Sequence, residues 1–167
     1  MMARWRPPPP KSSPYITPEG ERALKTELRE LWHLRRKDVV PALSAAAAEG
    51  DRSENAEYIY RKKQLGEIDR RIRYISKRLD VITVVDRIPQ QQDKAFFGCF
   101  VTLREEGGEI VRYRIVGADE IDPALGYISV DSPMARALLG KCRGDQVQVT
   151  MPDQTAQFEL LEVSYRQ

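Results

Sequence analysis

Histidine and cysteine are almost absent from this sequence: His33 is the only histidine, and Cys99 and Cys142 are the only cysteines among 167 residues. A single histidine argues against a histidine-based metal site and against a serine–histidine catalytic triad within this chain. The two cysteines lack metal-ligand spacing, and we expect reduced thiols in a cytoplasmic protein. No apolar run reaches the length of a membrane span, and no apolar signal segment follows the N-terminus.

Neither sign of charge dominates, because 27 Lys and Arg face 25 Asp and Glu for a net charge of +2. With 41% hydrophobic residues, the composition is that of a folded soluble protein. The exception is residues 1–14, which are basic, include Pro7-Pro8-Pro9-Pro10 and offer little to bury. We expect this lead to be a flexible tail.

A long first helix is predicted from Thr17 to Glu49. Thr17 suits the N-cap, and Gly50 ends the pattern. Pro41 lies inside the helix, where it lacks an N–H and crowds the preceding turn, so we expect a kink or a loosened turn there. An apolar stripe at helical spacing marks the buried face, formed by Leu24, Leu28, Leu31, Val39 and Leu43.

The second helix has the clearest periodicity in the sequence. Its apolar residues follow a heptad seam made of Tyr58, Leu65, Ile68, Ile72, Ile75, Leu79 and Ile82. Folding the chain about residue 53 brings this seam against the first helix. The sequence therefore predicts an antiparallel coiled-coil hairpin over residues 15–88, about 45 Å long. Gly66 lies off the seam and costs on the order of 1 kcal/mol relative to Ala.

The other faces of the second helix are mostly basic. The cations are Arg61, Lys62, Lys63, Arg70, Arg71, Arg73, Lys77 and Arg78. Four of them, Lys63, Arg70, Arg73 and Lys77, share one stripe. Two interpretations stay open: a solvated face on which Glu67 and Asp69 form local pairs, or a surface that holds nucleic acid through its phosphates.

A polar linker over residues 89–95 precedes a second domain, residues 96–167. Gly107-Gly108 predicts a tight turn between two of its strands. The strand-like runs are 97–105, 109–116, 127–130, 146–151 and 157–163, with a short helix at 134–139. The expected fold class is α+β, with the coiled-coil hairpin followed by a small antiparallel β-sheet domain.

The stretch between the helices, residues 50–58, carries Asp51 and Glu54. Two carboxylates three residues apart at a helix start share a face and offer oxygen ligands to Mg²⁺, which can activate water for attack on a phosphodiester. The competing interpretation is a helix cap, with Asp51 as the N-cap and Glu54 at the third helical position. Two acids are too few for a complete Mg²⁺ site, so a partner would have to supply the rest.

Residues 50–58 read GDRSENAEY, which resembles the signature of the bacterial Gre transcript-cleavage factors. The stretches at 89–91, 96–98, 113–117 and 131–139 resemble the GreB type of that family more closely than GreA. The resemblance spans about Tyr15 to Tyr165. The long lead over residues 1–14 and Gly66 are departures from the family pattern.

The resemblance implies a monomeric, membrane-free transcription elongation factor that binds RNA polymerase and inserts its coiled coil into the secondary channel. Its partners would be the polymerase and the nascent RNA 3′ end of backtracked complexes. Asp51 and Glu54 would help hold a Mg²⁺ of the polymerase active site, assisted by Ser53, Asn55 and Tyr58. The polymerase would then cleave the RNA, and the chain would need no cofactor of its own.

The resemblance also assigns roles outside the tip. The basic face from Arg61 to Arg78 would contact the extruded RNA. The second domain would be FKBP-like and would dock on the channel rim through Asp131, Ser132, Pro133, Met134 and Leu138. A role in the core stays the default expectation for the apolar Met134, Leu138 and Leu139. Two other functions stay open: a channel regulator that does not stimulate cleavage, and a prolyl isomerase suggested only by the FKBP-like fold.

Overall fold

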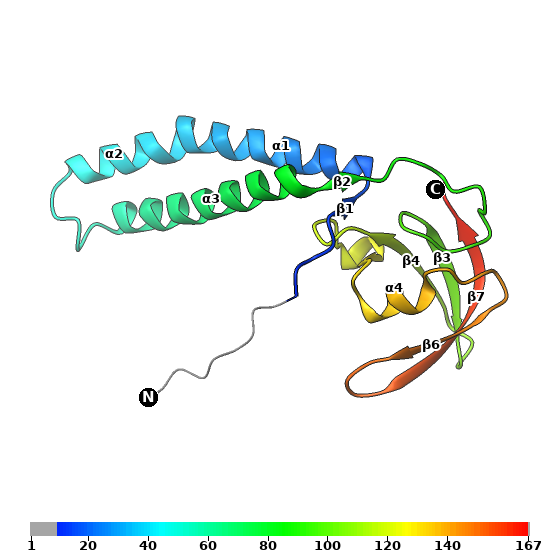
Figure 1. Ribbon diagram of the computed structural model, residues 1–167. Helices are drawn as coiled ribbons and strands as arrows, with labels where there is room; N and C mark the ends of the chain where they lie inside the picture. The colour runs from blue at the N-terminus through cyan, green and yellow to red at the C-terminus, as the bar shows by residue number, and fades with distance from the viewer. Residues whose placement is uncertain (1–9, 167) are drawn as a thin grey trace. The chain divides into compact units, whose positions relative to one another are not determined.

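The computed structural model describes residues 10–166, so most of the predicted tail lies outside the described residues (Figure 1). The chain divides into two compact units. One is helical and consists of Pro18–Ile82. The other combines the residues up to Thr17 with those from Thr83 onward. Residues 15–17 and 83–88, which the sequence placed in the hairpin, therefore belong to the second unit.

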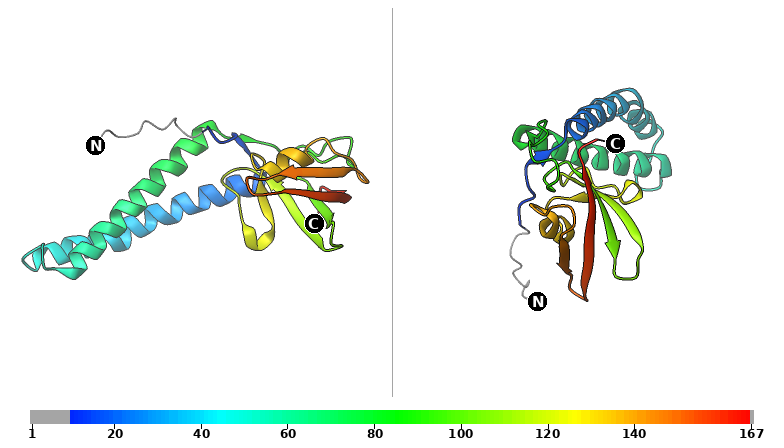
Figure 2. Two further views of the ribbon diagram at one scale, coloured as in Figure 1. Left: turned by 90° about the horizontal axis from the view of Figure 1, so that it is seen from below. Right: turned by 90° about the vertical axis from the view of Figure 1, so that its right-hand side faces the viewer.

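The helical unit is an antiparallel hairpin, as predicted. Its first arm consists of α1 (Pro18–Leu34), a π-helical turn η1 (Arg35–Val39) and α2 (Val40–Ala48). The second arm is the single helix α3 (Ala56–Val81), which runs back along the first (Figures 1 and 2). No helix between residues 10 and 166 is long and apolar enough to cross a membrane.

The first arm is loosened just before Pro41, which confirms the prediction made for that proline. In η1 the Val40 N–H donates to the Arg35 carbonyl, five residues back. The wider turn accommodates a residue that has no N–H to donate. Val39, at the end of η1, is fully buried and packs with Ile68 and Ile72 in the hairpin core.

Ion pairs join the two arms. Arg71 donates to both oxygens of Glu27 at 2.6 and 2.9 Å, and Arg35 donates to Asp69 at 2.8 Å. Both pairs are partly exposed, so each contributes less to stability than to the register of the arms. The local pair predicted for Asp69 is wrong, because its carboxylate faces Arg35 on the other arm.

The second unit contains a five-stranded sheet in the order β5-β4-β3-β7-β6. The strands, β3 (Phe100–Glu105), β4 (Ile110–Val116), β5 (Tyr127–Ser129), β6 (Gln146–Thr150) and β7 (Thr155–Ser164), fall within the predicted runs or within two residues of them. Three neighbouring pairs are antiparallel, but β4 and β5 are parallel, which the sequence did not indicate. A short 3-10 turn, η2 (Pro123–Leu125), precedes β5, and α4 (Pro133–Leu138) follows it.

A two-stranded parallel ladder brings distant parts of the chain together. β1 (Tyr15–Ile16) pairs with β2 (Thr83–Val84), so the segments on either side of the hairpin are joined. Thr17, expected to be a helix N-cap, donates its N–H to Glu120 at 3.0 Å and also its hydroxyl. A Cβ at Gly117 would lie 2.2 Å from the Tyr15 carbonyl oxygen, so this approach requires glycine.

Candidate functional site

The turn between α2 and α3 is held by its own polar side chains. Gly50 ends the first arm with a φ of 128°, which residues with a side chain rarely adopt. The Asp51 carboxylate then accepts two hydrogen bonds from Ser53, from the N–H at 2.9 Å and from the hydroxyl at 2.8 Å. These bonds, the backbone one first, lower the pKa of the fully exposed Asp51. The turn thus presents an ionised carboxylate to solvent.

Asn55, not Asp51, caps α3. Its Oδ1 accepts from the Tyr58 N–H at 3.1 Å, and its Nδ2 donates to the Ala46 carbonyl at 2.7 Å, so one side chain joins both arms. The predicted cap by Asp51 and Glu54 is wrong, because both acids precede the first helical residue. Glu54 is exposed, and it has no hydrogen bond or ion pair within residues 10–166. Both carboxylates are therefore left facing solvent.

Asn55→Ala should lower the free energy of unfolding of the hairpin by about 1–2 kcal/mol, because it removes a cap and a bond between the arms. Urea unfolding followed by circular dichroism at a helical wavelength measures this loss. Asn55→Asp retains the capping oxygen and loses only the amide donor, so an intermediate value is expected. Glu54→Ala is the matched control and should change stability by less than about 0.5 kcal/mol. Equal stability of Asn55→Ala and wild type would contradict the assignment.

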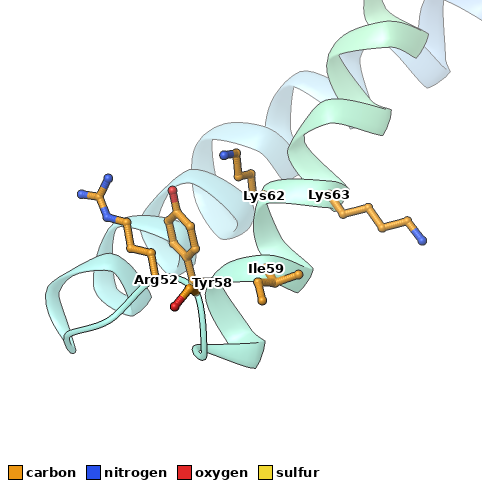
Figure 3. A pocket seen from close by; sticks show the side chains of 6 residues that line it. Arg52, Tyr58, Ile59, Lys62 and Lys63 are labelled. Carbon is orange, nitrogen blue, oxygen red and sulfur yellow. The ribbon is translucent and has the colours of Figure 1, made fainter.

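A shallow hollow lies beside the acids at the start of α3. It is lined by Arg52, Ser53, Tyr58, Ile59, Lys62 and Lys63. Figure 3 shows the Tyr58 ring beside Arg52 and Lys62, while Lys63 extends away from them. The Arg52 guanidinium carbon lies 5.5 Å from the ring centroid, and the Lys62 Nζ lies 5.9 Å from it. An aromatic ring among cations suits the bases and phosphates of a nucleic acid.

The predicted basic face divides into paired and unpaired cations. Arg61 donates to Glu57 at 2.8 Å, and Arg71 is held by Glu27, so both serve the hairpin itself. Arg78 is half-buried. The α3 stripe consists of Lys63, Arg70, Arg73 and Lys77, which are exposed and form no hydrogen bond or ion pair with any described residue. Lys62 is exposed and unpaired in the same sense, but its Nζ lies over the Tyr58 ring. The four side chains of the stripe keep their full charge available to a partner.

In the second unit, the predicted docking residues have different surroundings. The Asp131 carboxylate accepts from the Ser13 N–H at 2.9 Å and from the Ser13 hydroxyl. Ser132 caps α4 by accepting from the Ala135 N–H at 3.2 Å, and the adjacent Pro133 is exposed. Ser13 thus links the end of the predicted tail to the loop for which docking is predicted.

Leu138 is fully buried, and the half-buried Met134 packs against the same core. The core role expected by default for Leu138 is confirmed, and the predicted docking contact is wrong for this side chain, since it lies on the face of α4 that covers the sheet. Cys99 lies in this core, where burial raises its pKa to about 12 and leaves an unreactive thiol.

A metal ion would find only part of a site here. Between residues 10 and 166, no group of three or more His, Cys, Asp or Glu side chains is placed to hold one. Asp51 and Glu54 offer the hard oxygen donors that Mg²⁺ takes, but its octahedral shell needs about six ligands. The residues fit one edge of such a site, and the remaining ligands must come from elsewhere.

Two family descriptions match the sequence. "Transcription elongation factor, N-terminal" matches residues 14–84, and "Transcription elongation factor, GreA/GreB, C-term" matches residues 90–165. Transcription elongation factor GreB of Xanthomonas axonopodis pv. citri (strain 306) is 58% identical over 165 residues, which cover 98% of each chain. Transcription elongation factor GreB of Pseudomonas aeruginosa is 51% identical over 164 residues, with the same coverage.

Among solved structures, Thermus aquaticus Gfh1 is 20% identical. The comparison covers 92% of this chain and 99% of that one, with a TM-score of 0.42. An overlap of this size adds nothing to the sequence matches.

Proposed function

Because the chain belongs to the GreA/GreB family of transcription elongation factors, we propose that it binds RNA polymerase, enters the secondary channel with its hairpin and stimulates cleavage of backtracked RNA. The observation that carries the proposal is the position of Asp51 and Glu54. Both are exposed on a turn outside either helix. At 26 residues, α3 alone provides an arm about 39 Å long to carry them.

The incomplete site explains why the partner is needed. Asp51 and Glu54 would hold Mg²⁺ jointly with ligands of the polymerase, and the chain would have no cofactor of its own. When bound, the ion supplies an activated water for attack on the phosphodiester. The chain contributes two carboxylates, and the hydrogen bonds from Ser53 lower the pKa of Asp51 further below its ordinary value. Bond cleavage itself belongs to the polymerase.

The basic side chains of α3 suit the RNA that leaves the active site during backtracking. The hollow around Tyr58 lies next to the acids, and the α3 stripe continues along the helix. Unpaired Arg and Lys side chains attract phosphates without reading sequence. The second unit would dock on the channel rim through Asp131, Ser132, Pro133 and Met134, with Leu138 supporting them from the core.

Reversal of the α3 stripe by Arg70→Glu, Arg73→Glu and Lys77→Glu should reduce cleavage of long backtracked RNA by about tenfold, because repulsion replaces phosphate contacts. Polymerase affinity should change much less. Cleavage assays on complexes backtracked by short and by long distances, with a parallel polymerase-binding assay, measure the difference. Equal losses of cleavage and of binding would identify the stripe as a protein-docking surface.

The proposal is tested with halted, backtracked complexes of the cognate polymerase in Mg²⁺ buffer. Adding the wild-type chain should release short RNA fragments from the 3′ end and restore elongation. Slowed elongation without such fragments would overturn the proposal and favour a channel regulator that does not stimulate cleavage.

A further inference from the structure

The outer face of α1 carries a second row of cations that the proposed function does not use. The α1 row consists of Arg22, Lys25, Arg29 and His33 of α1 together with Arg36 of the adjoining η1, where His33 is a polar member and the others are charged. Steps of three and four residues place them on one side of the arm. That side lies opposite the seam, where Leu24 is buried and Leu28 and Leu31 are partly buried.

The members of the α1 row are exposed and lightly engaged. Lys25 pairs with Glu21 at 3.2 Å, and Arg29 donates to the Thr26 hydroxyl at 3.3 Å. Arg22 has no hydrogen bond or ion pair within the part of the chain that the structure describes. The acid Glu27 is turned toward Arg71 instead. Glu21 therefore partly neutralises Lys25, while Arg22, Arg29 and Arg36 form no ion pair with any described residue.

Shallow hollows and an exposed aromatic ring accompany the row. One hollow is lined by Arg22, Lys25, Thr26, Leu28 and Arg29, and another by His33, Arg36 and Lys37. Trp32, which lies between the two sets of lining residues in the sequence, is 39% exposed. The guanidinium carbons of Arg35 and Arg36 lie 5.7 and 6.0 Å from its ring. A tryptophan this exposed among arginines is a typical platform for base stacking.

The α1 row and the α3 stripe face away from each other. Each lies opposite its own side of the seam, and the two arms pack seam to seam through Ile68, Ile72 and Val39. A nucleic-acid strand that lies along α3 therefore cannot contact α1 with the same few nucleotides. We propose that the α1 row is a separate binding site for single-stranded nucleic acid, which it holds through phosphates and by stacking on Trp32.

The geometry favours an unpaired strand over a duplex or an acidic protein surface. From Arg22 to Arg36 the row extends about 21 Å in a straight line, which a flexible strand can follow. The phosphates of a duplex wind away from such a line after a few contacts. Arginine forks match phosphate oxygens, and Trp32 offers a face to a base. An acidic protein surface would engage the cations but would leave the tryptophan without a partner.

The test measures binding of the full chain to fluorescent single-stranded RNA and DNA of about 15 nucleotides, by anisotropy over a series of salt concentrations without polymerase. The variant Arg22→Gln, Arg29→Gln, Arg36→Gln should bind more weakly and reduce the salt slope by about 2, since each phosphate contact contributes about 0.7. The control Arg112→Gln, Lys141→Gln, Arg143→Gln removes the same charge from exposed positions of the second unit. It should keep the wild-type slope.

Trp32 provides a direct readout, because Trp5 and Trp32 are the only tryptophans. In a Trp5→Phe background, RNA should quench Trp32 emission, and the Gln triple variant should not show this quenching. An unchanged salt slope, or equal losses in the triple variant and its control, would overturn the proposal. The proposal would also be overturned if the Gln triple variant bound RNA normally but lost affinity for polymerase. That result would assign the row to a protein contact. No outcome depends on the tip acids, so failure here leaves the cleavage proposal standing.

Discussion

Asp51→Asn and Glu54→Gln, made singly, should each reduce stimulated RNA cleavage by about 100-fold while polymerase binding stays near wild type. Each substitution keeps the shape of the side chain and removes the charge with which it would hold Mg²⁺ beside the polymerase ligands. Losing several kcal/mol of electrostatic stabilisation corresponds to at least two powers of ten in rate. Neither acid packs against the hairpin, so the fold should not change. Fragment release from halted complexes gives the rate, and a competition assay gives the affinity.

Two controls separate the role of these acids from the general charge of the tip. Glu57→Gln removes a carboxylate from the first turn of α3, where it pairs with Arg61, and should leave cleavage within a few-fold of wild type. Ser53→Ala deletes one of the two hydrogen bonds to Asp51 and should give a smaller loss than Asp51→Asn. Undiminished cleavage by Asp51→Asn and Glu54→Gln would remove the basis for placing metal-binding residues at this turn.

Leu138→Ala should destabilise the second unit by about 2–5 kcal/mol, because it leaves a cavity in the core under α4. Opening of this core is measured through Cys99, which is fully buried in it. In a Cys142→Ser background, the rate of Cys99 labelling by a thiol reagent in moderate urea should rise by orders of magnitude. Polymerase binding should weaken only under conditions in which the core opens.

The neighbours of Leu138 supply the comparison. Leu139 is 37% exposed, and Leu139→Ala should cost less than about 1 kcal/mol. Leu138→Met conserves volume and should retain both stability and binding. A Leu138→Ala variant with normal Cys99 protection and lost polymerase binding would return Leu138 to the docking surface.

The sequence predicted the parts of this fold that depend on periodicity. The seam around Ile68, Ile72 and Ile75 has a helical repeat over several turns, and the strands of the second unit show apolar runs bounded by turns. A proline inside a helix loses a backbone hydrogen bond and crowds the preceding turn whatever the helix packs against. The loosened turn before Pro41 was therefore also predictable. The exposed position of Asp51 and Glu54 followed from a polar stretch between two helices.

Features decided by three-dimensional contacts could not be read from the sequence. Three residues near the tip, Asp51, Ser53 and Asn55, are all good N-caps, and the choice of Asn55 depends on its second bond to Ala46 on the other arm. The pairing of Asp69 with Arg35 likewise needs the register of the two arms. In α4, a short helix does not show which apolar residues face the sheet, so Leu138 looked equivalent to Leu139.

The parallel pairing of β1 with β2 makes the hairpin an insertion within another domain. The chain leaves the second unit at Thr17 and re-enters it at Thr83, in strands that are hydrogen-bonded to each other. A fragment that starts at residue 96 would lose this ladder, the Thr17 bonds to Glu120 and the backbone that fills the space at Gly117. Residues 18–82 are thus an inserted segment whose two ends both adjoin the β1–β2 ladder. This segment can be exchanged for the hairpin of a relative while the sheet, the ladder and the Thr17 bonds stay intact.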